Sequence, residues 1–349
     1  MSIAHKDILN LDVISKFVNE GFGGLPEEYR PVFTTLLEFV KGIDLHQKAL
    51  DKVITCSREA DVMPALAIHL FSQLVPRHAV EVDDTSKIGE HCPCGCLRKI
   101  PRGLTSLGSF DTWHGHADII VNQKVPIIFI EKRKQEEIMK MGGQNPDSDE
   151  EDTDSNSVCV ETEVDRNYDM DNEGPSKKKQ KTNDEGRDMA TFYGTLQDYN
   201  VIGKIIAQTV TNSFIQVNFN KDLSSLMIPA IGCTDQEFCI YLYNPEEDIL
   251  LHSMRDEKFW LIKSKLDLDA VIILWLFLNF TTFVKPKLVE EFYFEQSGIH
   301  QSLGSHIELY KKCKYKENFT NGATVDYEHF IYPRLPTLVR KIKRKSTIY

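Results

Sequence analysis

The stretch HADIIVNQKVPIIFIEK, residues 116–132, has two runs of apolar, mostly β-branched residues on either side of a short polar segment. Such runs predict two strands, HADIIV and VPIIFIEK, joined as a hairpin. Because proline cannot donate a hydrogen bond to a strand ladder, we place the connecting loop at residues 123–126 and keep Pro126 outside the pairing. With that loop, Asp118 lies opposite Glu131.

Two carboxylates would then share one face of the hairpin. Side chains alternate between the faces of a strand, so Glu131 and Arg133 lie on one face and Lys132 and Lys134 on the other. Close carboxylates repel unless a cation lies between them. Mg²⁺ or Mn²⁺ binds carboxylates together with waters and phosphates, and can activate a water for attack on a phosphodiester. The alternative interpretation is that Asp118 belongs to a turn and Glu131 is a solvated strand end.

The residues just before the first strand, DTWHGH at 111–116, add two histidines and a tryptophan. If the strand starts this early, His114, His116 and Asp118 share one face. We interpret the two histidines as neighbours of a metal ion or a phosphate. Trp113 is expected to pack the turn against the core.

Helical periodicity precedes the hairpin. Apolar residues recur every three to four positions, which predicts at least three helices. The segments are KDILNLDVISKFVNEGFG, PVFTTLLEFVKGI and SREADVMPALAIHLFSQLV. Residues 81–108 are rich in Gly, Pro and Cys and are expected to form a loop.

Further regular patterns follow residue 195. LQDYNVIGKIIAQTVTNSFIQ predicts a helix with a polar stripe of Lys204, Gln208 and Asn212 opposite an apolar one. Such a stripe is typical of a solvated face, and also of a helix beside a charged site. LMIPAIGCT, EFCIYLYN and DILLHSM predict a strand meander, and AVIILWLFLNF, residues 270–280, a buried helix too short to span a membrane. The whole pattern predicts an α/β or α+β sandwich.

The chain of 349 residues carries a net charge of −11, but its acidity is concentrated in one tract. Between Asp147 and Asp188 there are 15 acidic and 6 basic residues, so this tract carries −9 and the rest of the chain −2. Its low hydrophobicity predicts disorder. We therefore divide the chain into residues 1–141, an inserted tract at 142–187 and residues 188–349. The first and last parts are expected to form one domain.

Two basic runs are candidate interaction segments. One lies inside the acidic tract and has the composition that nuclear import receptors bind, or is a solvated charge block; it consists of Lys177, Lys178, Lys179 and Lys181. The other, RKIKRK near the C-terminus, could also contact phosphates. We expect an intracellular protein, nuclear or cytoplasmic, because eight cysteines occur without a signal peptide.

HCPCGC offers His91, Cys92, Cys94 and Cys96 as zinc ligands. Cysteines at every second position rarely surround one tetrahedral ion. A partner such as Cys56, or the histidines at 114 and 116, would have to complete the site. We therefore expect free thiols rather than a zinc site.

The order of helix, Asp118 strand, Glu131 strand and Gln208 helix resembles the PD-(D/E)xK nuclease-like superfamily over about residues 50–260. WHGHADI, IIAQTVTNSF and IPAIGCTDQEFCIYLYN are also similar to a group of uncharacterised animal proteins thought to belong to it. The resemblance implies a restriction-endonuclease-like core of three layers, with a mixed central sheet between helices. It further implies that Asp118 and Glu131 bind the metal, that Glu59 completes its shell and that Gln208 supports the site.

The chain departs from the superfamily pattern at Arg133, where a lysine is expected. Arginine stabilises phosphate charge but does not serve as a base. Lys132, Lys134 or Lys204 would have to supply the amine, or catalysis is lost. We therefore retain two hypotheses. One is a Mg²⁺-dependent nuclease acting on DNA or RNA, and the other is an inactive nuclease-like fold that binds nucleic acid or a protein.

Overall fold

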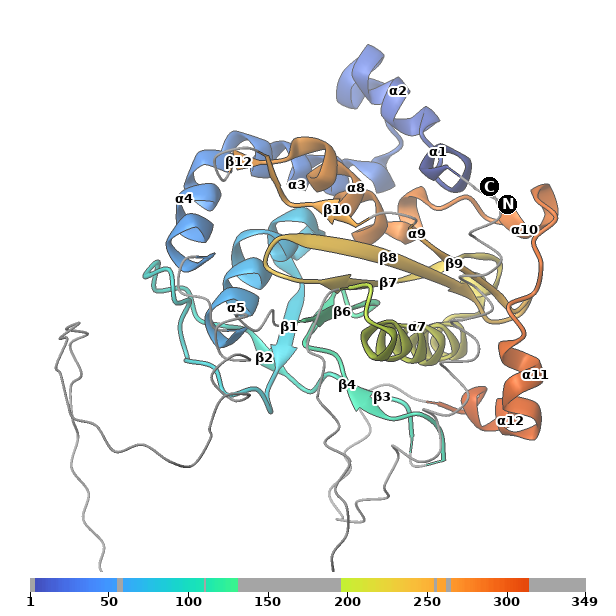
Figure 1. Ribbon diagram of the computed structural model, residues 1–349. Coiled ribbons are helices and arrows are strands. Elements are labelled where there is room, and N and C mark those ends of the chain that lie inside the picture. Colours follow the sequence, from blue (N-terminus) through green and yellow to red (C-terminus); the bar gives the residue numbers. More distant parts are fainter. Residues whose placement is uncertain are drawn as a thin grey trace, which may run out of the picture. The chain divides into compact units, whose positions relative to one another are not determined.

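The computed structural model describes residues 4–54, 59–109, 111–130, 196–253, 256–261 and 265–313 (Figure 1). The segments on either side of the acidic tract belong to one unit. The acidic tract itself, with its lysine run, and the basic C-terminal run lie outside the described residues.

A mixed sheet forms the centre of this unit. Its order is β10-β8-β7-β6-β5-β1-β2, with β9 paired to β8. The strands are β1 (Val80–Asp83), β2 (Arg102–Gly103), β5 (Ile119–Val121), β6 (Val125–Phe129), β7 (Ile228–Cys233), β8 (Glu237–Asn244), β9 (Ile249–His252) and β10 (Glu257–Lys258). The pairs β1·β5, β5·β6, β7·β8, β8·β9 and β8·β10 are antiparallel, whereas β1·β2 and β6·β7 are parallel.

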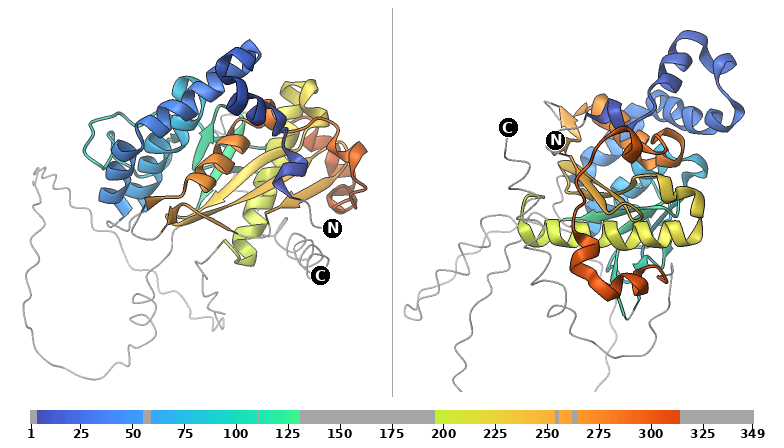
Figure 2. Two further views of the ribbon diagram at one scale, coloured as in Figure 1. Left: turned by 90° about the horizontal axis from the view of Figure 1, so that it is seen from above. Right: turned by 90° about the vertical axis from the view of Figure 1, so that its right-hand side faces the viewer.

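Helices cover both faces of the sheet (Figure 2). The long helix α7 (Tyr199–Phe219) packs on one face, where its apolar residues meet Ile120, Ile128 and Tyr241. The other face carries Ile119, Ile127 and Ile231 and is covered by the N-terminal helices together with α8 (Leu268–Leu278). This arrangement confirms the predicted mixed α/β fold with a central sheet between helices.

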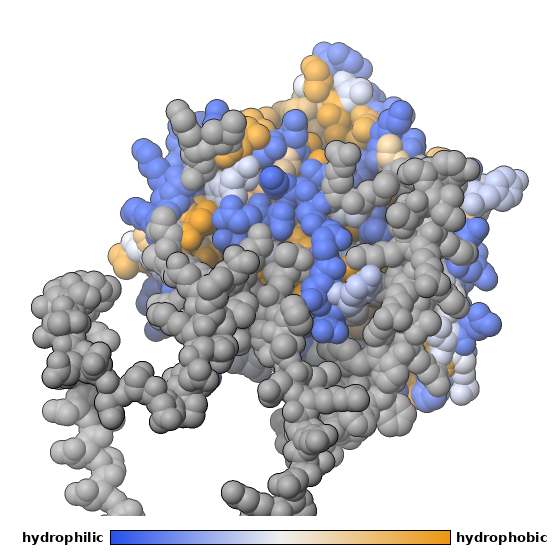
Figure 3. Space-filling model, in the orientation of Figure 1, coloured by the Kyte–Doolittle hydropathy of each residue, from blue (hydrophilic) through white to orange (hydrophobic). Residues whose placement is uncertain are grey.

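The N-terminal region is helical, as predicted. It contains α1 (His5–Ile8), α2 (Asp12–Glu20), α3 (Arg30–Lys41), α4 (Ile43–Ile54) and α5 (Glu59–His69). Short 3-10 turns lie at η1 (Gly21–Gly24), η2 (Glu27–Tyr29), η3 (Phe71–Leu74) and η4 (Pro76–His78). Some hydrophobic side chains of these helices stay exposed, such as Val18 and Leu45, and hydrophobic residues are visible at the top of the face in Figure 3.

The part of the chain after the acidic tract also has the elements that its sequence predicts. The predicted meander is present as β7, β8 and β9, and the predicted buried helix is α8. No helix in the described part of the chain combines the length and the apolar character needed to cross a membrane. The remaining elements are short: β3 (Ser106–Leu107), β4 (Gly115–His116), β11 (Trp260–Leu261), β12 (Lys265–Leu266), α9 (Phe280–Phe283), α10 (Leu288–Glu291), α11 (Ile299–Leu303), α12 (Ile307–Tyr310), η5 (Lys221–Ser225) and η6 (Gly304–His306).

Two local expectations were wrong. The segment at 81–108, expected to be a loop, begins with strand β1, whose two valines are buried beside β5. A strand of four residues alternating Val with acids has too little apolar length to stand out in the sequence. HADIIV is divided between β4, which pairs with β3, and β5, which pairs with β1 and β6.

Trp275 anchors α8 in the core. Its side chain is 1% exposed, its Nε1 donates a hydrogen bond to the Val32 carbonyl at 3.1 Å, and its ring contacts Phe33 and Phe283. We predict that Trp275→Ala lowers the free energy of unfolding by about 3–5 kcal/mol, measured by denaturant titration. Ile272→Ala on the same helix, at a side chain 38% exposed, should cost less than about 1 kcal/mol. Equal losses for the two variants would contradict this account of the core.

Candidate functional site

The β5–β6 hairpin has a different register from the predicted one. Ile119 pairs with Ile127, Ile120 with Pro126 and Val121 with Val125, so residues 122–124 form the connection. Pro126 is tolerated within the strand because the pairing of β6 with β7 begins only at Ile127. The expected loop at 123–126, and the alignment of Asp118 with Glu131 that followed from it, were therefore wrong.

Asp118 lies just before β5, where its carboxylate reaches the neighbouring strand. Its Oδ2 accepts a hydrogen bond from the Phe129 backbone N–H at 2.8 Å. Burial raises the pKa of Asp118, the charge of Lys204 opposes that shift, and the charge of Asp83 adds to it. Asp118 therefore lies among charged groups contributed by β1 and α7.

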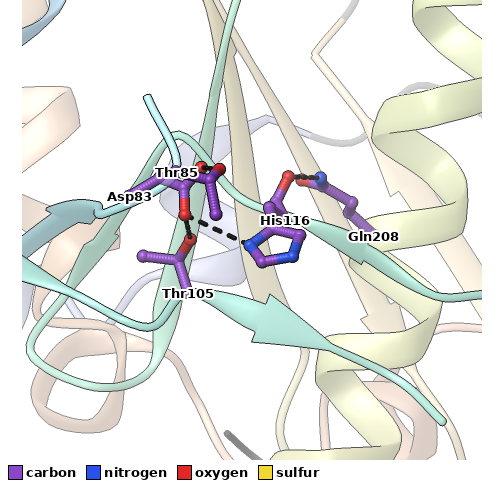
Figure 4. Close-up of polar contacts among 5 residues, drawn as sticks. All are labelled: Asp83, Thr85, Thr105, His116 and Gln208. Carbon is purple, nitrogen blue, oxygen red and sulfur yellow. Dashed lines mark hydrogen bonds and ion pairs between the residues drawn. The ribbon is translucent and has the colours of Figure 1, made fainter. Parts of the chain in front are cut away.

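Asp83, which the sequence did not single out, is the neighbour of Asp118 on β1. Its backbone N–H donates to the Asp118 carbonyl at 3.0 Å, and the residue is only 5% exposed. Its carboxylate accepts hydrogen bonds from the hydroxyls of Thr105, at 3.0 Å, and Thr85 (Figure 4). A third contact joins its Oδ1 to Nδ1 of His116 at 3.1 Å. Asp83 is thus fully engaged by protein groups.

His116 is held between Asp83 and α7. Because a carboxylate accepts hydrogen bonds, the contact to Asp83 is made by an N–H on Nδ1 of His116. The side chain of His116 is 33% exposed. The ring of His114 lies 5.8 Å away, and burial, followed by the charge of His116, lowers the pKa of His114. The sequence predicted that both histidines are neighbours of a metal ion or a phosphate. In the structure, His116 contacts Asp83 and His114 lies beside His116.

The polar stripe of α7, predicted as Lys204, Gln208 and Asn212, is not a solvated face. Lys204 is partly exposed, but Gln208 and Asn212 are buried, and so is Gln216 one turn further along. Gln208 Nε2 donates to the His116 carbonyl at 2.7 Å (Figure 4), Asn212 Nδ2 to the Lys124 carbonyl at 2.8 Å, and Gln216 Nε2 to the Gln123 carbonyl at 3.1 Å. The stripe thus supplies donors to backbone carbonyls around the hairpin.

Gln208 has a further property relevant to a ligand. It is fully buried, and its Oε1 is one of the buried oxygens in the described part of the chain that have no hydrogen-bond partner. An unpaired buried acceptor is costly and commonly marks a site that binds something. Lys204 lies one helical turn earlier and is partly exposed, and its charge lowers the pKa of Asp118, against the larger rise that burial causes.

Several predicted site residues cannot be placed. Glu131, Lys132, Arg133 and Lys134 follow β6 and lie outside the described residues. Glu59 begins α5, but its side chain is outside the described part. The described portion of the predicted site is therefore Asp118, Lys204 and Gln208, joined by Asp83 and His116.

A second cluster of polar side chains combines a histidine with the cysteine loop. His69, at the end of α5, and Cys92, Cys94 and Cys96 place their donor atoms within 4.8 Å of one another, an arrangement that could hold a metal ion. This weakens our expectation of a plain thiol loop. His91, the ligand suggested by the sequence, is exposed and forms a backbone bridge with Lys99 instead.

The sequence missed His69 because it lies 23 positions before Cys92 on an apolar helix, with nothing around it typical of a ligand. Burial, followed by the charges of His46 and Arg98, lowers the pKa of His69 to about 4. His69 is therefore neutral near pH 7, as a metal-binding imidazole must be. Burial likewise raises the pKa of Cys92 and Cys94, since it disfavours the thiolate form.

The raised pKa of Asp118 predicts a pH-dependent cost in stability. The folded state holds the Asp118 proton more tightly than the unfolded chain does, so ionised Asp118 destabilises the fold above that raised pKa. Asp118→Asn should therefore be more stable than the wild type near pH 7. The difference should shrink as the pH falls through the raised value and vanish below about pH 4, the ordinary aspartate range. Thermal unfolding across this pH series measures the effect. A variant less stable at pH 7 than at pH 4, relative to the wild type, would contradict it.

No protein-family model, curated protein or solved structure matches the chain.

Proposed function

We propose that this protein is a metal-dependent nuclease-like enzyme that hydrolyses phosphodiester bonds at the site around Asp118. The proposal is carried by one observation. Asp118 pairs through its backbone with Asp83, and the charge of Lys204 acts on its carboxyl group. It lies two residues after His116, whose carbonyl accepts a hydrogen bond from Gln208, a buried side chain whose Oε1 has no partner among the described residues. A carboxylate, a cation and an unpaired oxygen acceptor are the groups that metal-assisted phosphate chemistry uses.

The chain order supports the same proposal. α5 precedes the sheet, Asp118 lies directly before β5, Glu131 follows β6 in the sequence, and α7, which carries Gln208, leads to β7. The nuclease-like superfamily that the sequence resembles has a helix before this hairpin and a helix after it. Similarity of fold does not establish activity, because one fold serves many functions. The proposed function therefore rests on the polar residues at the strand ends and not on the fold alone.

The residues present fit a hard divalent cation such as Mg²⁺ or Mn²⁺. Asp118 offers a carboxylate, and Gln208 Oε1 is a buried oxygen without a partner. Asp83 is a poorer ligand, since its carboxylate already accepts from two threonines and contacts His116. We assign Asp83 to positioning His116, and Asp118 with Glu131 to the metal. When bound, the cation would polarise the phosphoryl oxygen and lower the pKa of a bound water.

The protein's own groups have separate roles in the hydrolysis. A water oxygen forms a bond to phosphorus as the water gives up a proton, the bond from phosphorus to one sugar oxygen breaks, and the departing sugar oxygen takes up a proton, so that protons balance overall. Lys204 stabilises the negative charge that gathers on the phosphate, because it is the described cation whose field reaches Asp118. It also stands in for the lysine that the superfamily pattern expects where this chain has Arg133. Asp83 holds the ring of His116 through Nδ1, and in this proposal the ring would lie next to the bound phosphate.

Cleavage assays on the full chain test this proposal. Plasmid DNA, single-stranded DNA and RNA are incubated with Mg²⁺ or Mn²⁺, or with a chelator. We predict metal-dependent cleavage that falls at least about 100-fold in Asp118→Asn and in Glu131→Gln, the size usual for losing one preorganised group in a catalytic site. Lys204→Gln should reduce cleavage, whereas Lys204→Arg should retain more of it because the charge is kept.

Asp84→Asn is the matched control, since Asp84 is exposed and directly follows Asp83. Its activity should equal that of the wild type. Cleavage that persists unchanged in folded Asp118→Asn and Glu131→Gln proteins would rule out the assigned site. A wild type that binds nucleic acid without cleaving it under any of these conditions would instead support an inactive nuclease-like binding module, the function that Arg133 favours.

A further inference from the structure

The loop that carries the three cysteines folds back on itself at the end of α5. It is closed by a backbone bridge between His91 and Lys99, and by a hydrogen bond from the Cys92 N–H to the Arg98 carbonyl at 2.8 Å. Between these closures, Gly95 at φ +81° and Leu97 at φ +60° turn the chain sharply. A left-handed conformation is unfavourable for leucine, so the surroundings must hold Leu97 in it.

The sulfur and nitrogen atoms gather tightly within this loop. Nε2 of His69 lies 3.1 Å from Sγ of Cys94 and 3.4 Å from Sγ of Cys96, and Sγ of Cys92 lies 3.3 Å from Sγ of Cys94. A tetrahedral zinc ion, with Zn–S of about 2.3 Å, sets two sulfurs about 3.8 Å apart and a sulfur and a nitrogen about 3.5 Å apart. The observed separations are close to these values and much longer than a disulfide bond of about 2.05 Å.

We propose that His69 Nε2 and the thiolates of Cys92, Cys94 and Cys96 bind one zinc ion in a closed, structural site. Four protein donors fill the tetrahedral shell of zinc, which leaves no position for a water or a substrate. Three sulfurs and one imidazole are the soft and borderline ligands that select zinc over Mg²⁺. This site is separate from the one around Asp118, and it does not rest on the proposed nuclease activity.

His46 holds the His69 ligand from behind. Nδ1 of His69 lies 3.4 Å from Nδ1 of His46, and both side chains are buried, at 1% and 6% exposure. If His69 binds the ion through Nε2, its Nδ1 carries a proton, and this N–H donates a hydrogen bond to Nδ1 of His46. The imidazole of His46 stacks on Phe39 with ring centroids 5.4 Å apart, which fixes its orientation. Such partners of metal-bound histidines set their tautomer and are important for metal affinity.

The zinc ion would fasten the connection between β1 and β2 to the helical region. The loop lies between Asp83, at the end of β1, and Thr105, just beyond β2, whose hydroxyl binds Asp83. On the helical side, α5 supplies His69, α4 supplies His46, and α3 supplies Phe39. Binding of the ion would therefore join three N-terminal helices to one edge of the sheet.

Metal analysis of the purified full chain tests the proposal. The protein is produced with zinc in the medium and kept reduced throughout. We expect about one zinc ion per chain, since one tetrahedral ion uses all four donors. Reconstitution of the stripped protein with Co²⁺ should give the absorption bands of a tetrahedral, thiolate-bound ion. Removal of the metal by a chelator should lower the unfolding temperature, because an ion that binds only the folded state stabilises it.

Paired variants locate the ligands. Cys96→Ser and His69→Ala should lose the zinc, whereas His91→Ala and Asp118→Asn should keep it. His91→Ala is the matched control because His91 lies directly beside Cys92 and is exposed. Cys96 is the exposed ligand, so Cys96→Ser should remain folded even if His69→Ala does not. Circular dichroism verifies that each variant is folded.

His46→Gln tests the positioning role of His46. This variant should keep one zinc ion per chain, but its zinc affinity should fall about 10–100-fold, the range typical for the loss of a partner that orients a metal ligand. Competition with a chromophoric chelator measures the affinity. Unchanged affinity would remove the positioning role and leave the four-ligand site in place.

Three results would overturn the zinc site itself. One is a reduced wild type that contains no zinc and takes up neither zinc nor cobalt. Another is a folded Cys96→Ser protein that binds zinc as tightly as the wild type. The third is mass-spectrometric evidence that freshly purified, metal-free protein carries a disulfide among the three cysteines. If the zinc results hold while cleavage fails, only the proposed nuclease function is refuted.

Discussion

Helix α7 is buried against the sheet, and several other features of the fold follow from this burial. β6 and β7 are parallel neighbours, and α7 lies in the connection between them, as parallel strands require. The helix is buried on its polar side as well as its apolar side, so each buried amide needs a partner. Gln208, Asn212 and Gln216 meet this requirement by donating to backbone carbonyls around the hairpin.

The hydrogen bonds from the buried amides of α7 also determine where the charged groups lie. Because Gln208 binds the carbonyl of His116, the chain just before β5 is held against α7, with Asp118 close behind. Asp83 pairs with Asp118 through the backbone on the other side. Burial of Asp118, and to a smaller extent the charge of Asp83, raises the pKa of Asp118, which reflects the cost of keeping this carboxyl group ionised. Proteins retain such costs chiefly at functional sites.

The two clusters lie on a continuous piece of chain. Asp83 ends β1, the cysteine loop follows, and β2 then leads to Thr105, which returns to Asp83. A metal ion bound by His69 and the cysteines would stabilise the cysteine loop between β1 and β2. A cation at Asp118 would bind near the end of β1, where this loop begins. Four protein donors converge at the His69 and cysteine cluster, whereas the surroundings of Asp118 include the unpaired Oε1 of Gln208 on α7.

Much of the secondary structure could be predicted from the sequence, because long periodic segments carry their own signal. EFCIYLYN corresponds to β8, the apolar stripe of α7 is buried as expected, and AVIILWLFLNF lies in the core as α8. Asp118 was also identified, at the junction of a polar turn and a β-branched run. The register of the hairpin could not be predicted, since it depends on which backbone groups of β6 are bound by β7 as well as β5.

The mixture of helices and strands, the hairpin around Asp118 and a loop that carries three cysteines could all be recognised from the sequence. Which side chains share a site, in contrast, follows from the tertiary fold. It placed Asp83 next to Asp118 by pairing β1 with β5, turned the polar stripe of α7 inward, and brought His69 to cysteines more than twenty residues away. Periodicity reports the face on which a side chain lies, whereas contacts between distant segments depend on how buried polar groups find partners across the whole fold.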